Sequence, residues 1–329
     1  MRYYFSKLDE HGRKIYKELY FGIEEFKDKI AVKGEEELVR DIYYMVIRDN
    51  PMMFNIHPYK ISYYKIGSYI WVEPIYVYTE EEFLKIKFKI NSMLKPFEEK
   101  LKTMPTSLER ERYIHKYLMS NVKYKYNSDK DDTRCHNILG VFIDKEAVCD
   151  GISKAFKHLC DLARINSNVI LGDSWNEYES KQSHAWNMVK INKKWYHIDV
   201  TWDINLAERF KYVRYDYFNL RECDIIRDHR NFEKLEVCNS LKNNFFYENN
   251  CIIYGEAELD KFLVDRFEKI KTDNASKNIY FKLYCDDDEN AMSLISSAIN
   301  NACLKTFYFT GSYIVESNAT QNVYLIRLS

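Results

Sequence analysis

The feature that most constrains the fold of this chain is a pair of alternating segments, HAWNMVKI and KWYHIDVTW, separated by Asn192 and Lys193. Alternation of this kind indicates two antiparallel β-strands, and Asn accepts the positive φ that a two-residue turn requires. Such a turn places Trp186 opposite Asp199. His184 then lies on the same face as Asp199 and diagonal to it, about 7–8 Å away at the backbone, so that the two side chains can bond.

The length of the turn decides whether this pair can form. A three-residue turn would place Asp199 opposite Asn187, on the other face of the hairpin, because side chains alternate along a strand with a period of two. His197 also shares the face of Asp199 and is a rival base, but it lies beside the turn and away from the strand end that carries His184. We therefore expect His184 to be the partner of Asp199.

A second constraint comes from EAVCDGISKAFK, residues 146–157, where a cysteine stands directly ahead of a helical pattern. Apolar side chains recur at the spacing of one buried helical stripe, at Ile152, Ala155, Phe156, Leu159, Leu162 and Ala163. Cys149 and Asp150 then occupy the first turn, where unpaired N–H groups and the helix dipole lower the pKa of a thiol. Position alone leaves Cys149 as either a nucleophile or a core residue, since free cysteines are commonly buried. Cys160 lies along the same stripe and is expected in the core.

Composition argues against several classes of function. The net charge is −1, which disfavours a nucleic-acid partner held by electrostatics. No segment approaches the roughly 20 apolar residues of a membrane span, and MRYYFSKLDEHG lacks the apolar run of a signal peptide. We expect no membrane association and a cytoplasmic location, while the oligomeric state stays open.

The cysteines and acidic residues do not follow a metal-binding pattern. The eight cysteines include no Cys-x-x-Cys pair, so we expect free thiols and no structural zinc site. The acidic stretch NSDKDDTR lacks the regular ligand spacing and the terminal Glu of a calcium loop. We therefore expect no metal and no cofactor.

The chain is expected to divide into three parts. All five prolines fall at or before Pro105, and residues 1–105 are predicted to form a mainly helical region with a β-hairpin that turns at Gly67 and Ser68. Residues 106–240 carry the cysteine helix and the paired strands. Residues 241–329 are predicted to form a small α+β sandwich, with a strand at 244–254 and a helix at 258–271. Two capping boxes predict helix starts, Thr79 with Glu82 and Thr106 with Glu109.

Three blocks in order, AVCDGISKAF, HAWNMVKINKKWYHIDVTWD and YDYFNLRECDIIRDH, resemble the transglutaminase-like superfamily over roughly Ser107 to Cys238. The resemblance is closest to its bacterial branch of cysteine peptidases. It implies an α+β, papain-like core in which the cysteine helix packs against an antiparallel sheet that carries the His and the Asp. It also implies that Cys149 is the nucleophile, His184 the general base and Asp199 the residue that orients the imidazole.

The chemistry that this resemblance implies is acyl transfer from a peptide or amide, with a peptide or protein as the substrate. Hydrolysis is the leading expectation. Crosslinking of glutamine to an amine is the second, and a non-catalytic binding or scaffold protein on the same fold is the third.

The sequence departs from the family pattern at the oxyanion site. Animal transglutaminases contribute an indole from upstream of the cysteine, but no Trp lies between Trp71 and Cys149. His136, in CHNILGVF, is a candidate for a second oxyanion donor or for the cleft lining, or it caps a helix. Trp186 is a candidate for the substrate groove or for a shield of the His–Asp pair.

Several other histidines and tryptophans are expected to have structural roles. Trp195 and Trp202 are expected to pack in the core of the sheet, and Asp203 is expected to end the second strand in a turn. Asp228 and His229 are assigned to a packing element. Two histidines on predicted helices, His115 and His158, are expected at the surface or at helix caps.

Overall fold

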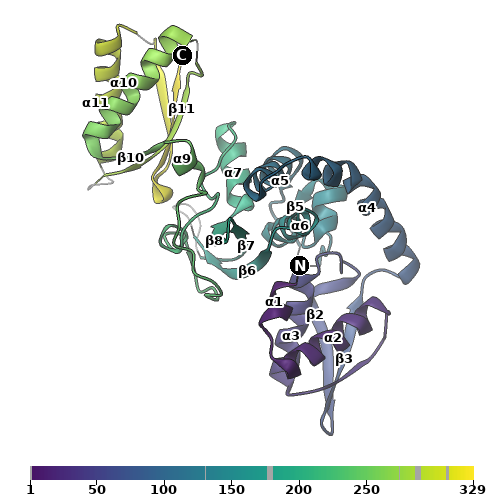
Figure 1. The fold of residues 1–329 in the computed structure, drawn as a ribbon. Helices are drawn as coiled ribbons and strands as arrows, with labels where there is room; N and C mark the ends of the chain where they lie inside the picture. The colour runs from purple at the N-terminus through teal and green to yellow at the C-terminus, as the bar shows by residue number, and fades with distance from the viewer. Residues whose placement is uncertain (1, 130, 176–180, 274, 286–289, 309–310) are drawn as a thin grey trace.

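The computed structural model describes residues 2–129, 131–175, 181–273, 275–285, 290–308 and 311–329. Helices and strands are both present in each part of the chain, and Figure 1 shows the N-terminal, central and C-terminal elements following one another along the molecule. The expected α+β class is therefore confirmed. Within the described ranges, the strands form three sheets of three or four strands and a short two-stranded pair.

The N-terminal elements surround a three-stranded antiparallel sheet in the order β1-β3-β2. They are α1 (Tyr3–Lys7), α2 (Glu10–Glu24), β1 (Ile30–Lys33), α3 (Glu36–Asp49), β2 (Ile56–Ile66) and β3 (Tyr69–Tyr76). The predicted hairpin is confirmed, because Ile66 pairs with Tyr69 across the Gly67–Ser68 turn. Strand β1 was not expected. It joins the sheet through β3, and its residues alternate between buried and exposed positions.

The central elements form a layer of helices against a four-stranded antiparallel sheet in the order β8-β7-β6-β9. The larger ones are α4 (Glu80–Lys102), α5 (Ser107–Asn121), α6 (Cys149–Leu162), β6 (Ser167–Ser174), β7 (Gln182–Ile191), β8 (Lys194–Ile198) and α7 (Val200–Phe210). The shorter ones are β4 (Lys123–Tyr124), a π-helical turn at Gly140–Asp144, β5 (Glu146–Ala147), α8 (Glu222–Ile225) and β9 (His229–Arg230). Both predicted capping boxes are confirmed, at the starts of α4 and α5.

One hydrophobic core joins the cysteine helix to its neighbours. Phe156 and Leu159 of α6 lie in it with Ile191 of β7 and Ile198 of β8. Helix α4 belongs to the same core through Phe83, Ile90, Leu94, Phe97 and Leu101, although it precedes Pro105. The division at residues 105 and 240 stays a proposal.

The second strand of the central hairpin ends earlier than predicted. Residues 200–210 form helix α7, so Trp202 and Asp203 lie on a helix, and the prediction of a strand that ends at Asp203 is wrong. The cause is Asp199, whose Oδ1 accepts a hydrogen bond from the Trp202 N–H at 3.1 Å and caps the helix. Asp is a preferred N-cap residue, so the chain leaves the sheet at Asp199.

The C-terminal module is a four-stranded sheet in the order β10-β11-β13-β12 with helices α10 and α11 packed against each other (Figure 1). Its elements are α9 (Phe245–Glu248), β10 (Ile252–Tyr254), α10 (Gly255–Asp273), β11 (Asn278–Tyr284), α11 (Ala291–Thr306), β12 (Tyr313–Asn318), a 3₁₀ turn at Ala319–Gln321 and β13 (Val323–Leu328). Strands β10 and β11 are parallel and α10 connects them, which is a βαβ unit.

The predicted strand at 244–254 is wrong over most of its length. Asn244 accepts hydrogen bonds from the N–H groups of Phe246 and Tyr247 and starts the short helix α9, so only Ile252–Tyr254 form a strand. The predicted helix at 258–271 is confirmed and is longer, because it begins at Gly255.

Candidate active site

Cys149 is the first residue of α6, and Val148 precedes it as the N-cap without a side-chain cap bond. The thiol is partly exposed, whereas Cys160 on the same helix is fully buried, as expected. Gly151 lets the start of the helix sit against the segment before the π-helical turn, because a Cβ at this position would lie 2.3 Å from the Cys135 carbonyl oxygen. All eight cysteines are free thiols, which confirms that prediction.

The hairpin register brings His184 and Asp199 together. Ile191 pairs with Lys194 around a two-residue turn, and Asn192 and Lys193 both have positive φ, which confirms the predicted turn. His184 Nε2 lies 2.6 Å from Asp199 Oδ2. The structure differs from the expectation only in that Asp199 stands just beyond β8 rather than inside it.

The pair is electrostatically coupled and buried. Burial of the His184 imidazole lowers its pKa, but the charge and the hydrogen bond of Asp199, together with the Cys149 thiol, outweigh burial and raise the pKa to about 10. Burial opposes the charge of Asp199 as well, yet His184 and two hydrogen bonds hold the pKa of this carboxyl well below its ordinary value. Because Nε2 is bonded to Asp199, Nδ1 is the ring nitrogen left for the thiol.

Trp186 covers this pair from one side. Its ring stacks on His184 with centroids 5.9 Å apart and an interplanar angle of 16°, and only 1% of the residue is exposed. The indole N–H donates to His197 Nδ1 at 3.1 Å, and burial together with the charge of His229 lowers the pKa of His197 to about 3. His197 is therefore a neutral acceptor for Trp186.

A second histidine contacts Asp199. His229 Nε2 lies 3.1 Å from Asp199 Oδ2, and His229 Nδ1 lies 2.6 Å from Asp228 Oδ1. Strand β9 carries His229 and pairs with β6, which is the neighbour of β7 in the sheet. The Asp228–His229 dipeptide was visible in the sequence, but its assignment to packing alone missed this contact.

Tyr59 of β2 reaches the start of the cysteine helix. Its hydroxyl donates to Asp150 Oδ2 at 2.7 Å and lies 2.9 Å from His136 Nδ1. Lys154 Nζ binds Asp150 Oδ2 at 2.8 Å and the His136 carbonyl at 3.0 Å. Sequence reasoning missed Tyr59, because its contact depends on how the N-terminal sheet meets α6. It also missed Lys154, although Lys154 and Asp150 are four residues apart on α6.

A pocket of about 420 Å³ opens beside the thiol. Its lining residues come from α3, β2, α6, β6 and β7: Tyr44, Ile47, Arg48, Pro58, Tyr59, Cys149, Asp150, Lys154, Leu171, Gly172, Ser183, His184 and Ala185. Neither His136 nor Trp186 is among the residues that line this pocket. His136 contacts Tyr59 and Lys154, and Trp186 stacks on His184.

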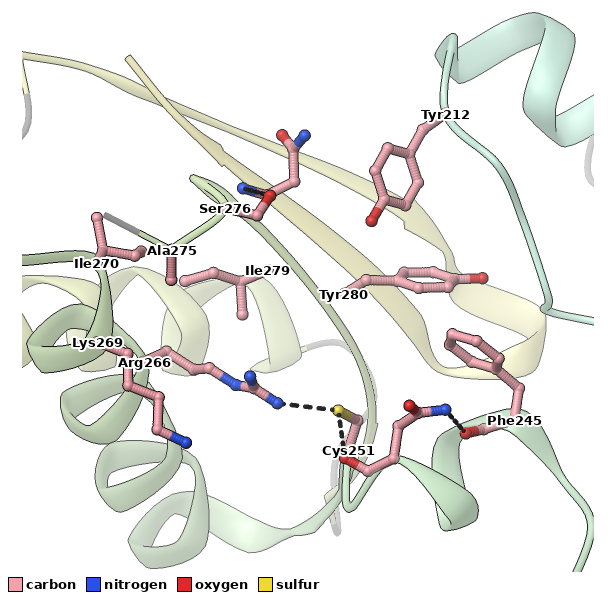
Figure 2. A pocket seen from close by; sticks show the side chains of 12 residues that line it. Tyr212, Phe245, Cys251, Arg266, Lys269, Ile270, Ala275, Ser276, Ile279 and Tyr280 are labelled. Carbon is pink, nitrogen blue, oxygen red and sulfur yellow. Dashed lines mark hydrogen bonds between the residues drawn. The ribbon is translucent and has the colours of Figure 1, made fainter. Parts of the chain in front are cut away.

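A separate pocket of about 350 Å³ lies at the C-terminal module, between Tyr212 and strand β11 (Figure 2). It also holds a cysteine beside a cation, since Arg266 Nη2 lies 3.3 Å from Cys251 Sγ. Burial raises the pKa of this thiol, with Arg266 opposing, and Sγ contacts the Asn249 carbonyl at 3.2 Å.

The metal-binding potential of the described residues is confined to one group. His184, Asp199 and His229 offer ligand atoms that lie within 4.8 Å of one another. Those atoms already bind each other, because both Nε2 atoms are directed at Asp199 Oδ2. Hydrogen bonding accounts for the cluster, and the absence of a metal stays a prediction.

Two other histidines differ from their predicted places. His115 and His158 were expected at the surface or at helix caps, but both are buried. His115 Nε2 lies 2.9 Å from Asp203 Oδ2, so the pair ties α5 to α7. Burial lowers the pKa of His158 to about 4.

Comparison with known proteins finds a similarity in the central part of the chain. Residues 96–200 match the family model of the transglutaminase-like superfamily. Cys149, His184 and Asp199 all lie within the matched residues.

Curated relatives and a solved structure are similar to this chain over part of its length. Kyphoscoliosis peptidase of Homo sapiens is 26% identical over 170 residues, which cover 46% of this chain and 25% of that protein. Kyphoscoliosis peptidase of Mus musculus is 25% identical over 170 residues with the same coverage. The chain thus spans about a quarter of the length of these relatives. A crystal structure of a TGase is 14% identical, with a TM-score of 0.32 over 53% of this chain and 50% of that one.

The hydropathy of the helices decides whether one of them could cross a membrane. Among the helices of the described residues, none combines the length and the apolar character that crossing a bilayer requires.

Proposed function

We propose that this protein is a thiol-dependent acyl-transfer enzyme that hydrolyses a peptide or amide bond. The single observation that supports it most is the placement of His184 between a partly exposed Cys149 and a buried Asp199 at the edge of a pocket. A nucleophile, a base and a group that orients the base are the three parts that such chemistry needs. The substrate that fits this chemistry is a peptide or a protein.

The first half-reaction forms a thioester. The Cys149 thiolate attacks the carbonyl carbon. The N–H of Cys149 stabilises the oxyanion, because the first N–H groups of a helix have no partner within the helix. His184 gives the proton on Nδ1 to the leaving amine as the C–N bond breaks. Asp199 keeps Nε2 protonated and stabilises the imidazolium before the transfer.

The second half-reaction releases the acid. His184, now neutral, takes a proton from water, and the resulting hydroxide attacks the thioester carbonyl. The C–S bond breaks, the carboxylic acid departs, and the thiolate–imidazolium pair is restored. The pocket wall formed by Tyr44, Arg48 and Tyr59 of the N-terminal unit faces the position of the substrate.

The test is selective labelling followed by substrate profiling. The wild-type protein is treated with iodoacetamide near pH 7 and the modified cysteines are mapped by mass spectrometry. Cys223, which is exposed, is the internal control. We expect Cys149 to react faster than Cys223 and to lose that advantage in His184→Ala. Equal labelling of both thiols would contradict the proposal.

A peptide library then identifies the reaction. Mass spectrometry of the products, with and without a primary amine, separates cleavage from amine incorporation. We expect cleavage that is absent in Cys149→Ala. Amine-dependent products alone would replace hydrolysis by crosslinking, and neither product would favour a binding role for the fold.

A further inference from the structure

His229 is the second histidine that contacts Asp199. The side chain is fully buried on β9, and His229 does not line the pocket at Cys149. Its two ring nitrogens face two different carboxylates, Nε2 toward Asp199 and Nδ1 toward Asp228, at 3.1 and 2.6 Å. An imidazole with a carboxylate at each nitrogen is satisfied only if both nitrogens carry a proton, because ionised carboxylates accept but do not donate.

Asp228 receives two hydrogen bonds at the oxygen that does not face His229. Its Oδ2 accepts from the Tyr217 hydroxyl at 2.7 Å and from Gln321 Nε2 at 3.0 Å. The Tyr217 oxygen itself accepts from Asn318 Nδ2 at 3.4 Å, so its hydrogen is free to point at Asp228. Two donors on Oδ2 stabilise negative charge on the Asp228 carboxyl. A carboxylate there has only Oδ1 left to accept from His229 Nδ1 at 2.6 Å.

The charged and titratable groups around His229 support the same assignment. Burial lowers the pKa of His229, but its hydrogen bonds to Asp199 and Asp228 and their charges outweigh burial and raise it. Indole rings of Trp186 and Trp202 cover the imidazole at centroid distances of 4.9 and 4.8 Å. The titratable or charged neighbours are Asp199, Asp228, His184, His197 and Tyr217.

We propose that His229 is a permanently protonated positioning residue that balances the charge of Asp199 throughout the catalytic cycle. When His184 gives its proton to the leaving amine, Asp199 would otherwise be a buried carboxylate without a cation, which is costly. His229 supplies that cation and leaves Asp199 ionised. It also weakens the hold of Asp199 on the His184 proton, so that His184 is a better acid. The catalytic consequence rests on the proposed function, whereas the protonation state of His229 does not.

The C-terminal module takes part in this arrangement. Gln321, in the 3₁₀ turn between β12 and β13, donates from Nε2 to Asp228 Oδ2 and to the Asp224 carbonyl at 3.1 Å. The module therefore completes the binding of the carboxylate that holds His229. A continuous series of hydrogen bonds runs from Gln321 through Asp228, His229 and Asp199 to His184.

The first experiment measures the protonation of His229 directly and needs no substrate. The full chain is labelled with ¹⁵N-histidine, and long-range ¹H–¹⁵N spectra report the state of each ring nitrogen between pH 5 and pH 9. The resonances of His229 are assigned with His229→Gln. We expect both nitrogens of His229 to be protonated at pH 7. A neutral tautomer at that pH would overturn the proposal.

The second experiment measures the effect on His184. Glutamine at position 229 can still donate to Asp199 but carries no charge, so in His229→Gln we expect the pKa of His184 to rise by about one unit, with a lower kcat and little change in KM. The alkaline limb of the pH–rate profile should move to higher pH with it. If His229 only held Asp199 in place, its replacement would free Asp199 and move the alkaline limb to lower pH. An unchanged limb would also refute the charge balance.

A second variant protects the test against misfolding. Asp228→Asn keeps His229 but removes one of its carboxylates, and we expect His229 to lose a proton and the His184 pKa to rise by a smaller amount. Circular dichroism and urea unfolding check the fold of both variants. If the wild type cleaves no peptide, the proposed function fails, but the ring-nitrogen spectra still decide the protonation of His229.

Discussion

Two pockets among the described residues each place a cysteine beside a cation, but in different ways. Cys149 is partly exposed at the start of α6 and faces His184, whereas Cys251 is buried and lies 3.3 Å from Arg266 (Figure 2). A guanidinium stays protonated at any pH at which the protein folds, so it attracts a thiolate but cannot deliver a proton. Imidazole can do both.

The two sites also differ in the residue that contacts the cation. His184 is fixed by Asp199 at 2.6 Å, while the guanidinium of Arg266 lies over the Phe262 ring at 5.0 Å. A cysteine next to a positive charge is therefore not sufficient for acyl transfer. The chemistry requires a proton carrier whose orientation is held by a further residue.

The largest effect is expected from the nucleophile itself. Cys149→Ala removes the attacking atom, and we expect the rate of peptide cleavage to fall by about 10⁴-fold or more. Cys251→Ser is the matched control and should leave the rate within about two-fold, because Arg266 cannot act as the acid. Steady-state cleavage of a peptide found in the library measures both. Comparable losses in the two variants would erase the distinction between the pockets.

The next largest effect is expected at the residue that holds the imidazole. Asp199→Asn keeps an oxygen for capping α7 but removes the charge that raises the His184 pKa, and we expect kcat to fall by about 10²–10⁴-fold. The ¹⁵N spectra of His184 should show its pKa near or below the ordinary value of about 6.5. An unchanged pKa would mean that Asp199 does not support the charge of His184.

The place of Cys149 on its helix and the contact of His184 with Asp199 could be predicted because they depend on local patterns, whereas their catalytic roles were inferred from the family resemblance. A two-residue turn fixes the register of β7 and β8, and helical spacing fixes the start of α6. The contact between His184 and Asp199 follows from the first of these. The end of β8 was missed because Asp199 serves both as a helix cap and as the partner of His184, and alternation alone shows neither role.

Contacts between distant segments could not be read from the sequence. His229 reaches Asp199 only because β9 joins the edge of the sheet beside β6. Tyr59 reaches Asp150 across 91 residues of chain, through the packing of the N-terminal sheet against α6. No periodicity or capping signal encodes how two separate surfaces meet, so the contact of His184 with Asp199 was predictable and the contacts of His229 and Tyr59 were not.

Glycines at the starts of the two helices sharpen the comparison further. A Cβ at Gly151 would lie 2.3 Å from a backbone oxygen, whereas Gly255 has φ +72° and open space around it. We expect Gly151→Ala to lower the free energy of unfolding by about 2–4 kcal/mol and to displace Cys149, with a loss of activity. Gly255→Ala costs about 1 kcal/mol through backbone strain alone, with cleavage unaffected. Urea unfolding and the cleavage rate measure both, and equal activities would show that Gly151 does not set the position of the thiol.

The two cations should also differ in how they couple stability to pH. The folded pKa of His184, about 10, lies above its ordinary value, so its contribution to stability is complete below about pH 6.5 and is lost as the pH rises through 10. The stability difference between wild type and His184→Gln should therefore shrink by about 2 kcal/mol between pH 6 and pH 10. The corresponding difference for Arg266→Gln should not follow this course, because Arg keeps its charge. Urea unfolding at several pH values measures both stability differences. The same pH dependence for His184→Gln and Arg266→Gln would contradict the prediction.

The smallest expected effect tests whether the N-terminal unit belongs to the catalytic pocket. Tyr59→Phe keeps the ring that lines the pocket and removes the hydroxyl shared by Asp150 and His136. One partly buried hydrogen bond to a carboxylate contributes about 1–2 kcal/mol, so we expect kcat/KM to fall by about 5- to 20-fold. Tyr212→Phe, at the other pocket, should leave the cleavage rate unchanged because Tyr212 does not reach Cys149.

A loss in Tyr59→Phe together with an unchanged rate of Cys149 alkylation would place Tyr59 in substrate binding, whereas a loss of both would place it in the positioning of the thiol. No loss in either measurement would mean that the N-terminal unit walls the pocket without contributing to the reaction.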